Sequence, residues 1–499
     1  MVDSSEEQLI DPDLLEGLRT IFASYGEDIY LVGGAVRDLF LKRTIHDLDF
    51  AVARRAIKFT FLVADKLGYP AYVLDQERDA ARVVIPPRGI TIDFAALRGQ
   101  TLEEDLYLRD FTINSMALPA LEIDKSKVID LFGGLEDLEQ KIIRPTNDKV
   151  ISSDPLRALR AVRLAVELDF SLSPDTEEII QLHRVLMSRV SGERIKDELV
   201  RILNSPRPAE GLEYLGCLGL YPFFNLGMKS GPEIRGGDQT ELNGVLRTAT
   251  LFTFLEKLNA LITRGRRLDD EDLRITFDIL EEFTAELDQY FNREIDGGFN
   301  GWTLLKLGAL FACINDIPEL VAAGNTQTGK DSAEKGIDSV STFVIDQLTA
   351  LRLSRAAQRY ILAVVAGSHR PLFMVNNKLN SRREIYRFFN KSYPAGLDIA
   401  WLSIASALAK QIDLTNSQEY SELLSMVRTL FDSYFRHYDK IVEPVHFING
   451  TDIMAELGLQ SGPVIGRLLD HIEEEQAAGE VENKDQALTL ARQLLDEFT

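Results

Sequence analysis

The 499-residue sequence is short of the residues that build metal and disulfide scaffolds. It has only two cysteines, Cys217 and Cys313, and six histidines. No CxxC pair or Cys/His cluster occurs, which argues against a zinc site and a disulfide framework and favours a reducing compartment. No apolar run reaches the roughly 18 residues of a transmembrane helix, and the acidic N-terminus lacks the apolar core of a signal peptide. We therefore expect a soluble cytoplasmic protein with no membrane partner.

Positive charge is also scarce. The sequence has 55 Lys and Arg against 78 Asp and Glu, a net charge of −23 with a pI near 4.8. This balance argues against a protein that bulk positive charge holds on nucleic acid. Residues 141–210 differ, because their 12 Lys and Arg and 11 Asp and Glu give +1. A local groove for a polyanion remains compatible with this distribution.

The length and the patterning predict an α+β domain followed by a long helical part. At roughly 100–200 residues per domain, two to four domains are expected. Period-2 and short apolar runs predict strands at 28–33, 47–52, 71–75, 81–86 and 90–97, with helices at 35–42 and 54–67. From about residue 154 the spacing is helical, and it predicts helices at 174–188, 192–204, 207–220, 243–264, 268–291, 302–315, 340–365, 381–391 and 418–438.

Small polar residues and glycines predict two loops, at 225–243 and 322–339. We divide the chain into a head at 1–150, a helical neck at 151–225, an all-α body at 226–440 and a helical tail at 441–499.

The sharpest group of polar residues surrounds a Gly-Gly turn. LVGGAVRD at 31–38 predicts a tight strand-to-helix turn with exposed backbone N–H groups, which suits phosphate, and Arg37 lies one turn into that helix. Asp47 and Asp49 follow in DLDF, two apart on one strand and so on the same face. Two carboxylates on one face can hold a pair of Mg²⁺ ions around a nucleoside triphosphate. Asp93, in ITIDFAAL, is a candidate third carboxylate.

Two further segments carry polar residues among apolar ones. In RDFTIN, Arg109 is a candidate phosphate ligand, which Asp110 would orient unless Asp110 contacts the ribose instead. Alternatively, these residues form only a surface ion pair and a helix cap. In DLFGGLEDL, Gly133 and Gly134 predict a turn between a strand and a helix, with a structural hinge as its expected role.

The fourth segment, DPLRALRAVR, offers a base-reading pair. Cytosine and adenine each present an amino donor beside an acceptor nitrogen, so Asp154 would accept from the amino group while Arg157 donates to the ring nitrogen. Uracil and guanine present the opposite order. Alternatively, Asp154 only caps the helix before Pro155. Arg160 and Arg163 continue the spacing of three.

Together these motifs resemble the class II tRNA nucleotidyltransferase and bacterial poly(A) polymerase family. GGAVRD with DLD, RDFTIN, DLFGGLEDL, DPLRALRAVR and SGERIKDEL occur in the family's order over about residues 28–225. The resemblance implies a polymerase-β-like head that adds nucleotides from CTP and ATP to an RNA 3′ end without a template. Asp47 and Asp49 would hold two Mg²⁺ ions. The triphosphate ligands would be Gly34, Arg37 and Arg109. Asp154 and Arg157 would read the base, with support from Arg160 and Arg163.

The motifs depart from the family pattern at two places. Ser153 replaces the usual Glu before Asp154, and Leu108 replaces the usual Arg before Arg109. The sequence also lacks a His-Asp motif outside His46-Asp47, so we expect no phosphohydrolase activity.

The function predicted first is synthesis or repair of the tRNA 3′-CCA end. Poly(A) addition, CC addition and A addition remain open, because the choice between C and A depends on loop mobility and fine geometry. A non-catalytic RNA-binding protein is the alternative of another class, and Mg²⁺-dependent incorporation of CTP and ATP would separate it from an enzyme. The oligomeric state does not follow from the sequence.

Overall fold

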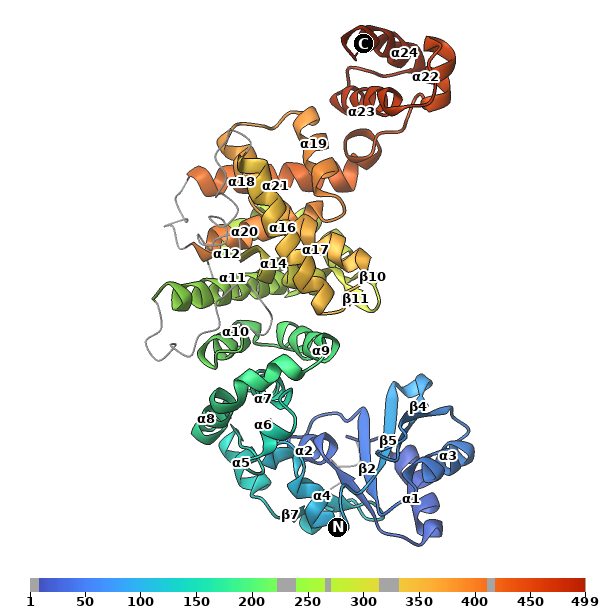
Figure 1. The fold of residues 1–499 in the computed structure, drawn as a ribbon, viewed down its shortest axis with the longest axis vertical. Coiled ribbons are helices and arrows are strands. Elements are labelled where there is room, and N and C mark those ends of the chain that lie inside the picture. The colour runs from blue at the N-terminus through green and yellow to red at the C-terminus, as the bar shows by residue number, and fades with distance from the viewer. Residues whose placement is uncertain (1–8, 222–238, 265–270, 314–331, 411–417, 499) are drawn as a thin grey trace. The chain divides into compact units, whose positions relative to one another are not determined.

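The computed structural model describes residues 9–221, 239–264, 271–313, 332–410 and 418–498. The chain forms two compact units, Met1–Val190 and Ser191–Thr499. The first is α+β and the second is nearly all helical, as expected (Figure 1). The boundary between the units falls inside the neck predicted at 151–225. The finer division into head, neck, body and tail therefore stays a prediction.

A seven-stranded mixed sheet with the strand order β3-β4-β5-β2-β1-β6-β7 organises the first unit. Its strands are β1 (Ile29–Val32), β2 (Asp47–Val52), β3 (Ala71–Asp75), β4 (Ala80–Ile85), β5 (Ile90–Ala96), β6 (Met116–Pro119) and β7 (Ile129–Asp130). A parallel pair forms a second small sheet, β8 (Ile142–Ile143) with β9 (Ser171–Leu172). The unit's helices are α1 (Pro12–Tyr25), α2 (Gly34–Phe40), α3 (Ala56–Leu67), α4 (Leu102–Tyr107), α5 (Gly134–Gln140), α6 (Val150–Ser153), α7 (Arg157–Leu168) and α8 (Pro174–His183).

The period-2 pattern of β2 separates the core from the candidate site. Leu48 and Phe50 are 1% exposed, whereas Asp47 and Asp49 alternate with them and face the other side. Phe50 stacks on Phe94 of β5 at 5.3 Å between ring centroids. Helices α1 and α3 cover this aromatic face of the sheet (Figure 1). Burial of these rings fixes the strand register, because a slip by one residue would put carboxylates into the core.

The N-terminal helix α1 was not expected from the acidic sequence. Asp11 caps it by accepting the backbone N–H of Leu14 at 3.0 Å, and Pro12 occupies its first position. Its apolar face, which includes Leu18 and Phe22, is buried. The cap and this face together explain why the segment is helical.

Helices make up almost all of the described part of the second unit. They are α9 (Gly192–Leu203), α10 (Pro208–Cys217), α11 (Gln239–Arg264), α12 (Glu271–Leu280), α13 (Thr284–Asn292), α14 (Gly301–Ala312), α16 (Ser332–Ala350), α17 (Arg355–Gly367), α18 (Arg370–Asn376), α19 (Arg382–Ser392), α20 (Gly396–Ala409), α21 (Gln418–Arg436), α22 (Gly450–Leu457), α23 (Pro463–Ala478) and α24 (Lys484–Phe498). A short hairpin of β10 (Glu294–Asp296) and β11 (Phe299–Asn300) interrupts them. Among the described residues, none of the helices combines the length and apolarity that a membrane crossing requires.

Several predicted boundaries in this unit were wrong. The single helix predicted at 340–365 is two helices, because Ser354 accepts the N–H of Ala357 and starts α17 anew. The helix predicted at 268–291 is likewise divided into α12 and α13. The loops predicted at 225–243 and 322–339 lie mostly outside the described residues. Their described ends, 239–243 and 332–339, are helical.

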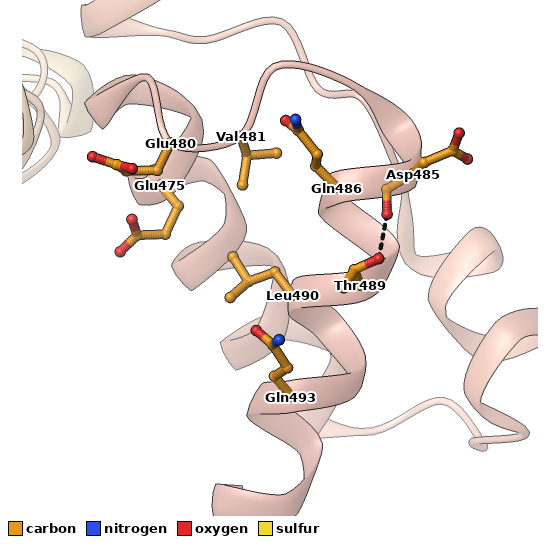
Figure 2. Close-up of a pocket in the computed structure, with 8 residues that line it drawn as sticks. All are labelled: Glu475, Glu480, Val481, Asp485, Gln486, Thr489, Leu490 and Gln493. Carbon is orange, nitrogen blue, oxygen red and sulfur yellow. Dashed lines mark hydrogen bonds between the residues drawn. The ribbon is translucent and has the colours of Figure 1, made fainter.

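The last three helices, α22, α23 and α24, share a small buried cluster of their own. Ile448, Ile453, Leu468 and Ile472 build their buried cluster. A capping box between Asn449 and Asp452 starts α22. A cavity of about 350 Å³ opens between α23 and α24 and is lined by Glu475, Glu480, Val481, Asp485, Gln486, Thr489, Leu490 and Gln493 (Figure 2). Its three carboxylates make it unsuited to a triphosphate.

Candidate active site

The turn between β1 and α2 needs its first glycine. Gly33 has φ +73°, a conformation that glycine adopts without strain. A Cβ at this position would lie 3.1 Å from Nη1 of Arg109 and 3.4 Å from Oδ2 of Asp49. Arg109, a predicted triphosphate ligand, and Asp49, a predicted metal ligand, therefore both lie close to the backbone at Gly33. Gly34 begins α2, and the guanidinium of Arg37 lies beside it.

Asp47 and Asp49 lie on one face of β2, as predicted. Asp47 is exposed, and its Oδ1 accepts a hydrogen bond from Oγ1 of Thr91 at 2.6 Å. Asp49 is partly buried, and burial followed by the negative charge of Asp93 raises its pKa to about 6. The carboxylates of Asp49 and Asp93 therefore repel each other in a poorly solvated region, and a divalent cation would reduce this repulsion.

Asp93 is the register partner of Asp49 on the neighbouring parallel strand β5. Arg82 binds both of its oxygens, at 2.6 and 2.7 Å. Its charge is therefore already compensated by a bidentate ion pair. Within the described ranges, no three His, Cys, Asp or Glu side chains are close enough to form a ready metal cluster. The role of Asp93 as a third metal ligand stays a prediction, whereas its influence on the pKa of Asp49 follows from the structure.

Asp105, which the sequence interpretation passed over, holds Arg109. The Nε and Nη2 atoms of Arg109 donate to Oδ2 of Asp105 at 2.9 and 2.8 Å. The prediction that Asp110 orients Arg109 was wrong, because Asp110 instead accepts from Arg160 at 3.2 Å and from Nδ2 of Asn114 at 3.0 Å. The spacing Asp105–Arg109, one helical turn, was the available signal.

Arg37 is already engaged within the protein. It forms a bidentate pair with Asp38 at 2.9 Å and donates to Oδ1 of Asn114 at 2.8 Å. Through Asn114 it is linked to Asp110, and through Asp110 to Arg160. This chain of polar contacts ties the Gly-Gly turn to α7, so that a ligand contact by Arg37 would also affect the base-reading segment.

The base-reading segment is built differently from the expectation. Helix α7 begins at Arg157, and Asp154 lies between α6 and α7, where its Oδ1 accepts the N–H of Leu156 at 3.3 Å. The assigned N-cap position of α7 is Leu156, so Asp154 accepts a backbone N–H of the turn that leads into the helix. Nη2 of Arg157 donates to the carbonyl of Leu108 at 2.9 Å. Arg163 is buried and pairs with Glu167 at 2.6 Å, a position from which it supports the helix.

Arg98 is a second residue that the sequence interpretation missed. Its Nη1 donates to the same Leu108 carbonyl, at 3.4 Å. Burial, followed by the positive charge of Arg109 and with a smaller contribution from Arg157, lowers the pKa of Arg98. Three guanidinium groups therefore crowd around Asp105 and the Leu108 carbonyl, an arrangement that favours an anionic ligand. Its place directly after the strand that carries Asp93, in DFAALR, was the sequence feature that could have identified Arg98.

The DLFGGLEDL segment packs against the RDFTIN segment of the candidate site. Asp130 accepts the N–H groups of Gly134 and Leu135 at 2.8 and 2.9 Å. A Cβ on Gly134 would lie 2.5 Å from the Thr112 carbonyl, so α5 approaches the RDFTIN segment at glycine distance. Thr112 also donates to Asp137 at 2.7 Å. The hinge role predicted for this segment stays a prediction.

Three family models match this chain. The model described as the Poly A polymerase head domain matches residues 29–99 and 91–144. Two further models match 169–230, described as a probable RNA and SrmB-binding site of polymerase A, and 341–491, described as a putative tRNA nucleotidyltransferase domain 2. These regions contain the Gly-Gly turn, both carboxylates and most of the helical second unit.

The individual proteins to which this chain is similar include tRNA nucleotidyltransferases. A CC-adding tRNA nucleotidyltransferase from Geobacter sulfurreducens is 40% identical over 195 residues, which is 39% of this chain and 45% of that protein. A CC-adding tRNA nucleotidyltransferase from Synechocystis is 27% identical over 466 residues, 93% of each chain.

Among solved structures, the Bacillus stearothermophilus CCA-adding enzyme in complex with CTP shares the fold. It has a TM-score of 0.62 and 21% identity, covering 99% of this chain and 98% of that one. The fold and the sequence similarity therefore point to the same family. The chain belongs to the tRNA nucleotidyltransferase and poly(A) polymerase family of enzymes.

Proposed function

We propose that this enzyme adds C and A nucleotides to the 3′ end of tRNA from CTP and ATP, and so builds or repairs the CCA end. The observation that carries the proposal is the position of Asp47 and Asp49 on one strand face, beside the Gly33 turn and Arg109. Carboxylates, an exposed backbone turn and arginines are the groups that phosphoryl transfer requires. The matched family models support it.

Asp47 and Asp49 would hold Mg²⁺, because hard oxygen donors in a region of excess negative charge suit this ion. Bound there, the ions would activate the RNA 3′-hydroxyl and neutralise the leaving pyrophosphate. Side chains of the protein would bind the triphosphate. Arg109, kept in place by Asp105, binds phosphate oxygens, and Arg98 adds a further cation to that position.

Base choice would depend on Asp154 and Arg157 in this proposal. The carbonyls of Leu108 and Arg109 accept from Arg157, so its guanidinium is oriented before a nucleotide arrives. A donor held in this orientation rejects uracil and guanine, because binding either base would leave polar groups of the base and the protein unpaired. Arg160 supports the pair through its contact with Asp110.

The second candidate is an enzyme that adds only the two C residues. Both relatives described above carry that name. The connection between β5 and α4 is only five residues long, 97–101, and the N–H of Arg98 is bonded to Oδ1 of Asp105 at 3.0 Å. Because a switch from C to A requires the pocket to rearrange, a short and anchored connection favours a single base.

The test of the proposal is incorporation of labelled CTP and ATP into a tRNA transcript, with and without Mg²⁺. Transfer that requires both the metal and a tRNA 3′ end supports the proposal. Equal transfer to an unrelated hairpin would point to poly(A)-type activity, and absence of transfer would favour a non-catalytic RNA-binding protein.

A further inference from the structure

One part of the second unit reverses the acidic character of the chain. Residues 351–392, which contain α17, α18 and α19, have nine Lys and Arg and a single acidic residue, Glu384. Their net charge is therefore +8, in a protein whose total is −23. A stretch of this sign is unlike the rest of the unit and attracts polyanions.

Only part of this positive charge is neutralised inside the protein. Arg383 pairs with Glu475 at 2.6 Å, and Arg387 pairs with Glu474 at 2.5 Å, which fastens α19 to α23. Five other cations are exposed and, within the described ranges, lie beyond ion-pair distance of any carboxylate. These are Arg352, Arg355, Arg359, Lys378 and Lys391.

Two exposed rings lie among these cations. Arg370 donates to Oγ of Ser392 at 2.9 Å and so joins the start of α18 to the end of α19. Phe373, one turn further along α18, is 59% exposed, and Tyr393, next to Ser392, is 79% exposed. We call Arg370, Phe373, Lys391 and Tyr393 the cation–aromatic patch. Rings as exposed as these are not stabilised by burial in the core, because most of their apolar surface stays in contact with water.

We propose that the cation–aromatic patch binds unpaired nucleotides of the tRNA substrate. Cations attract the phosphates, and the rings stack on bases, a combination that single-stranded nucleic acid meets and a base-paired stem does not. The inference rests on the proposed function for the identity of the RNA. It adds a second place of RNA contact, in a different unit from the carboxylates.

The experiment compares wild type with the double variant Phe373→Ser/Tyr393→Ser. The variant should raise KM for a full tRNA transcript about fivefold or more. The KM for CTP and kcat should not change. A two-stranded RNA duplex of the acceptor stem, which has no loop, should bind the two proteins equally. Leu246→Ser, at an exposed position of α11, is the matched control and should behave as wild type. Phe373→Tyr should also keep wild-type KM.

An unchanged tRNA KM in the double variant would overturn the proposal and leave the patch to an acidic protein partner. An equal loss on the loop-free duplex would overturn the stacking argument. If wild type does not extend tRNA, the proposed function fails on its own. Direct binding of fluorescent tRNA to wild type and double variant then still decides the patch: weaker binding by the variant supports it, and equal binding refutes it. Lys378→Gln/Lys391→Gln should reduce the salt dependence of binding.

Discussion

Arg98 and Arg157, which are 59 positions apart in the sequence, donate to the same backbone oxygen, the carbonyl of Leu108, at 3.4 and 2.9 Å. Arg109, the next residue, is anchored by Asp105. The carbonyl therefore gathers guanidinium groups that would otherwise repel one another. This arrangement concentrates positive charge at one place in a chain whose net charge is −23.

Replacement of Arg98 tests this arrangement. Arg98→Gln should raise KM for CTP roughly tenfold, the effect of losing one charge-assisted contact, while thermal stability stays close to wild type. Arg98→Lys should recover part of the loss. Steady-state kinetics at fixed tRNA concentration measures this effect. Arg54→Gln, which removes an exposed cation that pairs with Glu27 at 3.6 Å, is the control. A normal KM in Arg98→Gln would show that the third guanidinium is dispensable.

The carboxylates should be essential for chemistry but not for folding. Asp47→Ala and Asp49→Ala should each abolish nucleotide transfer, because metal binding is lost. Folding should survive, since Asp49 is held at a raised pKa by burial and by Asp93 and so contributes no favourable charge. Transfer assays and thermal melts measure the two effects. Near-normal transfer by either variant would refute the metal assignment.

Base selection should depend on Arg157. In Arg157→Ala the donor to the ring nitrogen is lost, so discrimination between CTP or ATP and UTP or GTP should fall or disappear. Competition assays with all four nucleotides report the ratio directly. Arg163→Ala offers a contrast, because Arg163 is buried against Glu167 and should affect stability more than choice. Unchanged selectivity in Arg157→Ala would contradict the base-reading interpretation.

Gly134 should tolerate no side chain. In Gly134→Ala the new Cβ would lie 2.5 Å from the Thr112 carbonyl, which would push α5 away from the RDFTIN segment. We expect a loss of about 1–3 kcal/mol of stability together with reduced activity. Gly133→Ala is a useful comparison, because its φ of +77° is strained for alanine but no atom lies within 4 Å of the Cβ. A smaller loss in Gly134→Ala than in Gly133→Ala would contradict the close-approach argument.

A buried carboxyl in the second unit should make stability depend on pH. Asp398 accepts from the hydroxyls of Tyr290 and Tyr360 at 2.7 and 2.6 Å, and burial raises its pKa to about 6. The folded state therefore holds this proton more tightly than the unfolded state, whose value is near 3.8. Stability should fall by about 2 kcal/mol as pH rises from 4 to above 6, and then level off.

Asp398→Asn removes the titrating group and should flatten this dependence. Denaturant unfolding at pH 4, 5, 6 and 7 measures the free energy of unfolding in both proteins. The slope is the diagnostic quantity, because the amide also changes absolute stability. Parallel pH curves for the two proteins would assign the pH dependence to other groups.

Most strands and turns of the head could be predicted from the sequence, because their patterns involve residues that are close together in the chain. The alternation in DLDF placed Asp47 and Asp49 on one face, and the glycines at 33 and 34 marked the turn. Buried helices were harder to find. Helix α20 is buried on nearly all sides, so its sequence lacks the period of an amphipathic helix and it was not predicted.

Side-chain partners in the site also escaped the sequence interpretation. The one-turn spacing from Asp105 to Arg109 permits their ion pair, but whether it forms depends on how α4 packs on the sheet. Arg98 lies 59 positions from Arg157, so only the fold brings the two together at Leu108. The chemistry of the site was predictable from residue types, whereas its internal pairing was not.

The most direct test of the proposed activity uses purified protein, Mg²⁺ and three tRNA transcripts, ending before CCA, after C and after CC. Each receives CTP, ATP, both, or UTP with GTP, and the products are sized at single-nucleotide resolution. We expect addition of C, C and A to the shortest transcript and then a stop. Addition of only CC would select the narrower enzyme, and a long A tail would select poly(A) addition. Absence of any incorporation would contradict the central claim that Asp47 and Asp49 form a nucleotidyltransferase site.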